Sequence, residues 1–264
     1  MSARMNAPAI VGQGPPLVFV PGMDGTGLLF YRQVDALARD FRVVTYRLHD
    51  DARDMATLID QLGEVCDAAS PAGEPAILVG ESFGGALALS FALVHPARVR
   101  ALVILNSFPF FRPQWRLRLA RLGISLIPWG AMRVVRRLTA HRLHSPHTPR
   151  AEREAFHRLT AAARKPGYLN RLRILRSYDV RSALPSLRVP VLFLAADQDH
   201  LIPSVEQARL MVSLVPSASL RVLHGHGHSC FLADDIDLSV MLRAWLSQRD
   251  ADPGAMRVPT TPIR

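Results

Sequence analysis

A serine flanked by glycines, Gly80-Glu81-Ser82-Phe83-Gly84, is the residue pattern in this chain that most directly suggests chemistry. It follows an apolar run at 75–80 and begins a run of small and apolar residues at 83–95. Such runs are typical of a buried parallel strand and of a helix packed closely on it. A serine at this strand-to-helix turn is held on a strained backbone, where its hydroxyl can act as a nucleophile. The pattern predicts nucleophilic catalysis by Ser82, with a plain glycine-rich turn as the alternative.

Nucleophilic serine needs a base that accepts its proton and an acid that orients the base. Candidates stand in two loops that follow later apolar runs. They are Asp197 and Asp199 after 189–196, and His224, His226 and His228 after 220–225. The order serine, aspartate, histidine is satisfied, but the residues alone do not decide which aspartate and which histidine take part.

A metal site is the competing interpretation of the alternating histidines. In a strand, H-x-H-x-H places three imidazoles on one face, about 6.6 Å apart, and nearby carboxylates could add ligands. That arrangement would leave the Ser82 turn without a purpose, so we expect no metal. A second set, His141, His144 and His147, has no cysteine or close carboxylate beside it in the sequence, and we expect it on a solvent-exposed face.

The ordered set of turn, acid loop and histidine loop resembles the α/β-hydrolase superfamily, along most of the chain. Members often carry an aspartate four residues before a proline, as Asp199 and Pro203 do, and a base that follows a glycine, as His228 does. The resemblance implies that Ser82, Asp199 and His228 form a catalytic triad. It leaves Asp197 as the alternative acid and His226 as the alternative base.

Two main-chain N–H groups should stabilise the oxyanion, and the resemblance assigns them to Met23 and Phe83. Met23 belongs to Pro21-Gly22-Met23-Asp24-Gly25-Thr26-Gly27, where proline replaces the family's common histidine. This change leaves a main-chain donor in place. The pair of motifs PGMDGTGLLF and GESFGG resembles bacterial hydrolases that are related to plastid esterases and acyltransferases acting on lipid esters.

Elements that must position these residues alternate along the chain as strand and helix, which predicts an α/β fold with a doubly wound, mostly parallel sheet. Strands are expected at 15–22, 41–48, 75–80, 99–107, 189–196 and 220–225, and helices at 28–40, 54–68, 83–95, 203–215 and 236–248. Only about 15 residues precede the first strand, so we expect a sheet shortened at that edge. Residues 1–107 and 188–248 should form the core, 108–187 a helical cap, and 249–264 a loose tail.

Charge is distributed unevenly over the 264 residues, whose net charge is +10. Residues 108–185 carry 17 basic and 3 acidic residues, so this segment holds the whole positive excess. No zinc-finger, bZIP or RNP pattern accompanies it, which argues against nucleic acid. An acidic ligand, an acidic carrier protein or an anionic membrane surface remains as a partner. Arginines such as Arg116 and Arg118 alternate there with apolar residues, which suits either a membrane surface or an ordinary solvated helix.

Two cysteines, Cys66 and Cys230, are too few for a disulfide framework. With no signal peptide or long apolar span in the sequence, we expect a cytoplasmic protein, with peripheral membrane contact as an option through the basic cap. The leading hypothesis is a cofactor-independent serine hydrolase that cleaves carboxylic esters through an acyl-enzyme. The alternative is an acyltransferase or thioesterase that uses acyl-CoA or acyl carrier protein, and a binding module that retains the fold is a third.

Overall fold

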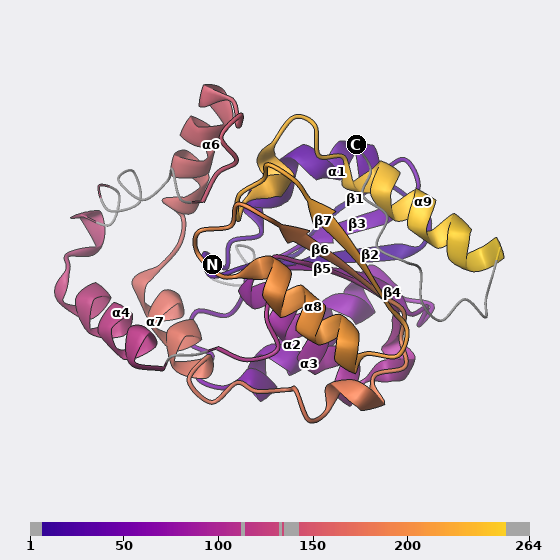
Figure 1. Ribbon diagram of the computed structural model, residues 1–264, viewed down its shortest axis with the longest axis horizontal. Coiled ribbons are helices and arrows are strands. Elements are labelled where there is room, and N and C mark those ends of the chain that lie inside the picture. Colours follow the sequence, from indigo (N-terminus) through magenta and orange to yellow (C-terminus); the bar gives the residue numbers. More distant parts are fainter. Residues whose placement is uncertain (1–6, 112–113, 132–133, 135–142, 252–264) are drawn as a thin grey trace.

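A seven-stranded sheet forms the centre of the computed structural model, which describes residues 7–111, 114–131, 134 and 143–251 (Figure 1). The strand order is β1-β3-β2-β4-β5-β6-β7, and every pair is parallel except β1 with β3. The strands are β1 (Ala9–Val11), β2 (Pro16–Val20), β3 (Arg42–Thr45), β4 (Ala76–Glu81), β5 (Val99–Leu105), β6 (Val191–Ala196) and β7 (Ala218–Leu223). The predicted fold class is confirmed.

Helices cover both faces of the sheet, as the alternation of strands and helices predicts. On one face, α1 (Tyr31–Leu37) and α9 (Leu238–Ala251) pack over one apolar cluster. On the other face, α2 (Met55–Ala69), α3 (Phe83–Val94) and α8 (Ser204–Leu214) pack over a second cluster. The central strands β2, β4 and β6 are buried along their whole length, because both of their faces are covered.

The two ends of the predicted core differ in detail from the sequence-based expectation. An additional edge strand, β1, precedes β2 and pairs antiparallel with β3, so the sheet begins earlier than we expected. Three exposed residues with no strong pattern gave no signal for this strand. At the other end, α9 continues to Ala251, so the predicted tail from 249 starts inside a helix, and 252–264 lie outside the described residues.

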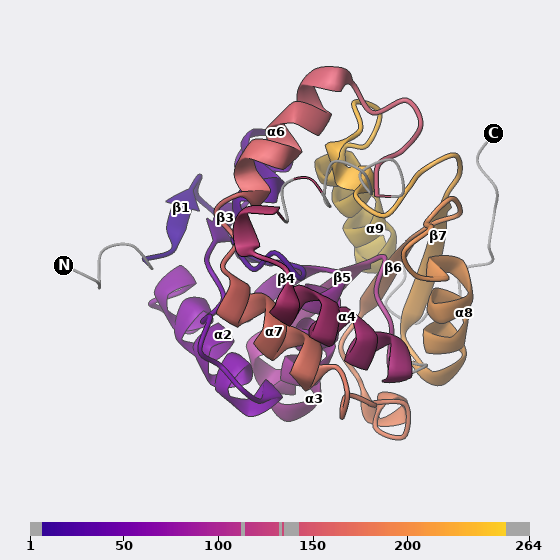
Figure 2. The same ribbon diagram turned by 90° about the vertical axis from the view of Figure 1, so that its left-hand side faces the viewer.

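An insertion of mainly helical structure separates β5 from β6, in the segment predicted to be a cap (Figure 2). It contains α4 (Gln114–Leu126), α6 (Arg150–Thr160) and α7 (Lys165–Ile174), and α4 lies against α7 while α6 lies against the turn of 3-10 helix Leu28–Phe30. The basic stretch with Arg133, Arg136 and Arg137, and His141 with it, lie outside the described residues. Among the helices that the structure describes, none is long and apolar enough to cross a membrane.

Candidate active site

Ser82 occupies the sharp turn between β4 and α3, with φ 53° and ψ −117°. This conformation is strained for a residue with a side chain, and it persists because the surrounding packing requires it. A Cβ on Gly84 would overlap the Val20 carbonyl, and one on Gly80 would overlap the Gly84 main chain. The glycines of the motif therefore allow helix and strand to pack this closely, as the sequence predicted.

Asp199 and His228 come together at the carboxyl ends of β6 and β7. The His228 Nδ1 and Asp199 Oδ2 atoms are 2.6 Å apart, and both side chains are buried. Main-chain N–H groups of Leu201 and Ile202 and the Ser204 hydroxyl donate to the same carboxylate. Although burial alone would raise it, His228 and these donors lower the pKa of Asp199. The acid is therefore held ionised beside the imidazole.

The three alternating histidines turn to three different partners. His224 is exposed and its Nδ1 lies 2.9 Å from Asp197 Oδ2, while the same aspartate accepts the Gly225 N–H. Asp197 thus orients its own loop. His226 faces Asp235, at 3.4 Å between Nε2 and Oδ2, and does not contact Asp199. The structure thus pairs Asp199 with His228, and Asp197 with the exposed His224.

Asn106 joins the ends of three strands beneath the site. It follows β5 with φ 43°, is fully buried, accepts the Ala196 N–H, and donates to the His228 carbonyl at 2.6 Å. Asn106 therefore fixes the main chain of the histidine loop. The neighbouring Cys230 is also buried, and burial raises the pKa of its thiol to about 12, which suits a residue that packs rather than reacts.

Glu81 is a buried carboxylate that the sequence interpretation missed. Its Oε1 lies 3.3 Å from His228 Nε2, the nitrogen that must face the serine hydroxyl if His228 is the base. The described residues offer no hydrogen bond to the Ser82 hydroxyl in this arrangement. Burial raises the pKa of Glu81. Burial alone would lower the pKa of His228, but Asp199 and Glu81 outweigh it and raise that pKa to about 10.

Phe83 directly follows Ser82, and Met23 lies in the turn after β2, the strand that pairs with β4. Phe83 is the first residue of α3, where N–H groups have no partner within the helix. Met23 lies in a turn that is closed by the Gly25 N–H donating to the Gly22 carbonyl. The fully buried Arg171 of α7 donates to the Met23 carbonyl at 3.0 Å and to the Asp24 carbonyl at 3.2 Å. Nothing in the sequence singled out Arg171 from the many arginines of the insertion.

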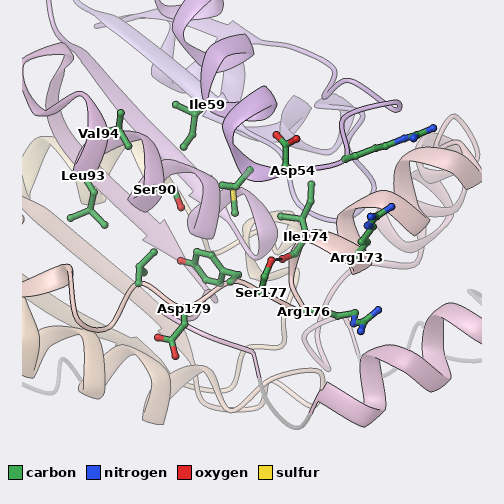
Figure 3. Close-up of a pocket in the computed structure, with 14 residues that line it drawn as sticks. Asp54, Ile59, Ser90, Leu93, Val94, Arg173, Ile174, Arg176, Ser177 and Asp179 are labelled. Carbon is green, nitrogen blue, oxygen red and sulfur yellow. Dashed lines mark hydrogen bonds between the residues drawn. The ribbon is translucent and has the colours of Figure 1, made fainter.

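A cavity elsewhere in the described structure does not involve these residues. It is a groove of about 780 Å³ between α2, α3 and the end of α7, and it contains Ile59, Ser90 and Ile174 (Figure 3). Arg173 and Arg176 come from the α7 side of the groove. Because Ser82, Asp199 and His228 are not among its lining residues, the groove is separate from the candidate active site.

Comparison with known proteins agrees with this fold. Residues 15–235 match the family described as the alpha/beta hydrolase fold, and the chain belongs to that family. It is a hydrolase of the α/β fold, with esterases among its relatives.

Individual relatives differ in what their names say they act on. A pimeloyl-[acyl-carrier protein] methyl ester esterase of Stenotrophomonas maltophilia is 30% identical, over 90% of this chain and 95% of that protein. A protein of Yersinia enterocolitica named as a carbamate hydrolase is 29% identical, over 90% of each. Phytyl ester synthase 1 of the Arabidopsis thaliana chloroplast is 29% identical, over 88% of this chain but 37% of the plastid protein. An esterase structure from Exiguobacterium antarcticum superposes with a TM-score of 0.80 at 20% identity, over 91% and 94% of the two chains, which shows likeness of fold.

Proposed function

We propose that this protein is a serine hydrolase that cleaves carboxylic esters through an acyl-enzyme. The observation that carries the proposal is the buried Asp199–His228 pair, whose His228 Nε2 atom contacts Glu81, the residue next to Ser82. The Ser82 oxygen attacks the ester carbonyl, and His228 takes the hydroxyl proton and returns it to the leaving alcohol. Asp199 orients the imidazole and stabilises its charged form. Water then attacks the acyl-enzyme with the help of the same base, which releases the acid.

Oxyanion stabilisation comes in this proposal from the Met23 and Phe83 N–H groups. A donor of this kind contributes about 3 kcal/mol to the transition state. The Phe83 position at the start of α3 supports its role, because the first N–H groups of a helix point away without a partner. Arg171 supports the role of Met23 by holding the Met23 carbonyl, which fixes the direction of the adjoining peptides.

Substitution of Ser82 tests the proposal. We expect Ser82→Ala to lower kcat for p-nitrophenyl esters by at least about 1,000-fold, because the nucleophile is lost. A fluorophosphonate probe should label the natural protein and not the variant. Ser213→Ala, which removes an exposed hydroxyl in α8, is the matched control and should keep full activity. Turnover that survives in Ser82→Ala would contradict the proposal.

The two aspartates of the acid loop give a second, sharper comparison. Asp199→Asn should lower kcat about 1,000-fold or more, because the imidazole loses its orienting charge. Asp197→Asn is its matched control, since Asp197 pairs instead with the exposed His224. If the two variants lost equal activity, the assignment of Asp199 as the acid would be wrong.

An acyl group on an acidic carrier is the second candidate substrate, with hydrolysis or acyl transfer as the outcome. Two observations favour it: the basic insertion between β5 and β6, which we propose acts as a cap, and the relative that is named for an acyl carrier protein ester. The test compares one acyl methyl ester, free and linked to acyl carrier protein. A higher kcat/KM for the linked form supports this candidate, and equal values contradict it.

A further inference from the structure

A cluster of two imidazoles and one carboxylate lies beside the candidate active site without belonging to it. His147 comes from the insertion, while His226 and Asp235 come from the histidine loop and the segment after it. The His147 Nε2 atom is 3.1 Å from Asp235 Oδ1, and the His226 Nε2 atom is 3.4 Å from Asp235 Oδ2. The candidate ligand atoms all lie within 4.8 Å of one another. From this geometry we propose that His147, His226 and Asp235 form a binding site for a zinc-like divalent transition metal.

The spacing of the cluster suits such an ion. Tetrahedral zinc with bonds of about 2.0–2.1 Å holds its ligand atoms about 3.3 Å apart. Each histidine already lies at close to this distance from one oxygen of the Asp235 carboxylate, His147 from Oδ1 and His226 from Oδ2. The side chains of His147 and Asp235 are 47% and 59% exposed, so they can rotate until all three ligand atoms surround one ion. Solvent can supply the fourth ligand.

Surrounding hydrogen bonds prepare His226 as a ligand. Its Nδ1 lies 3.1 Å from the Ser145 hydroxyl, which also accepts the Gly227 N–H. Metal-bound histidines usually donate their other ring N–H to an oxygen of this kind, which fixes the ring and leaves Nε2 for the metal. The ring of His147 meets that of His226 edge to face, with centroids 4.8 Å apart. His226 is buried and held, so His147 and Asp235 need only adjust to it.

The site lies at the contact between the insertion and the histidine loop. The Ser229 N–H donates to the Leu143 carbonyl, and a Cβ on Gly227 would overlap the His144 carbonyl. Both contacts show how closely the segment 143–148 approaches the loop of His228. A metal held by one residue of that segment and two of the core would fasten the insertion to the loop. We therefore expect bound metal to stabilise the folded chain.

Zinc titration of tag-free, chelator-treated protein tests the proposal. Calorimetry should give one zinc per chain, and zinc should raise the Tm. His147→Gln and Asp235→Asn should each weaken binding at least about 100-fold, more than the loss of a supporting residue does. His224→Gln, in the same loop but paired with Asp197, is the matched control and should bind zinc like the natural protein. Mg²⁺ and Ca²⁺ should not compete, because they prefer oxygen ligands.

Each result of this experiment decides the question. An absence of zinc binding overturns the proposal. Zinc binding that survives both His147→Gln and Asp235→Asn also overturns it, because a metal held elsewhere, for example by Glu81 and His228, would be insensitive to both substitutions. Circular dichroism checks that the variants fold. If either variant fails to fold, X-ray absorption of the zinc-loaded natural protein replaces it. A spectrum that shows two imidazoles and one carboxylate as zinc ligands supports the proposed site, and any other set of protein ligands contradicts it.

Discussion

At the scale of single residues, His228 lies between two carboxylates that act on different ring nitrogens. Asp199 contacts Nδ1, where a triad acid belongs, whereas Glu81 contacts Nε2, where the serine hydroxyl belongs. Glu81 therefore competes with Ser82 for the base. Because both carboxylates stabilise the charged imidazole, they keep His228 protonated to high pH, and a protonated imidazole cannot accept the serine proton.

Replacing Glu81 should shift the pH dependence of the reaction. A base with a pKa raised to about 10 is fully protonated near neutral pH, so kcat/KM should rise as the pH increases through the alkaline range. Glu81→Gln removes one of the two stabilising charges, which lowers that pKa, and the rise should move to lower pH by about 1 unit or more. The measurement is a pH profile of kcat/KM on a neutral ester, with a chelator in every buffer. Profiles that coincide would show that Glu81 does not act on the base.

The residue types and their spacing predicted part of this site, and there are physical reasons why they did not predict the rest. Ser82 was identifiable because its turn requires glycines at fixed positions, and Asp199 and His228 because a loop after a strand must present them. Glu81 belongs to the same motif, but a continuous apolar run does not reveal that the last side chain of its strand turns toward a base. Arg171 and the cluster of His147, His226 and Asp235 depend on contacts across more than 70 residues of chain, and short-range patterns carry no information about those contacts.

At the scale of elements, helix α7 connects the insertion to the turn that carries Met23. Arg171 donates to the carbonyls of Met23 and Asp24, and its Nη1 atom lies 3.7 Å from Asp50 Oδ1. A Cβ on Gly25 would overlap the guanidinium, so the turn is shaped around this side chain. One buried guanidinium thus fixes two successive carbonyls of the turn that carries Met23.

Arg171→Lys should impair catalysis more than substrate binding. Lysine keeps the charge but presents a point donor, which cannot satisfy two carbonyls in the geometry of guanidinium. We expect kcat to fall about 10- to 100-fold with a smaller change in KM, because the Met23 N–H loses its orientation. The exposed Arg173→Lys, two residues along the same helix, is the control and should leave both constants unchanged. An equal effect of the two variants would exclude a specific role for Arg171.

Elements of the core were predictable from the sequence to a large extent. Buried parallel strands such as β4 and β6 read as continuous apolar runs, and helix α3 as a run of small residues, so their positions agree within a few residues. Strand β1 was missed because three exposed edge residues have no periodicity. The arrangement of α4, α6 and α7 was not predictable beyond their helical character, because an exposed insertion lacks the two-sided burial that marks the sheet.

At the scale of the whole molecule, the positive charge and the candidate active site belong to different parts of the chain. Residues 1–107 carry 8 basic and 11 acidic residues, whereas 108–185 carry 17 and 3. The insertion is therefore the part of the molecule that attracts an anion. Exposed charges act over a distance that salt shortens to about 10 Å at 0.1 M ionic strength, so their effect on a charged substrate is measurable.

Salt should therefore separate a carrier-linked substrate from a small neutral one. If an acidic carrier docks on the insertion, kcat/KM for an acyl carrier protein ester should fall at least about 10-fold between 0.02 and 0.5 M NaCl. The value for a p-nitrophenyl ester should change less than about 2-fold, because a neutral ester is not steered. The double variant Arg118→Gln/Arg121→Gln in α4 should weaken the salt dependence measured with the acyl carrier protein ester. The matched double variant Arg209→Gln/Arg221→Gln, equally exposed but outside the insertion, should retain it. Equal salt dependence for both substrates would instead indicate that the charge of the insertion plays no part in recognising the substrate.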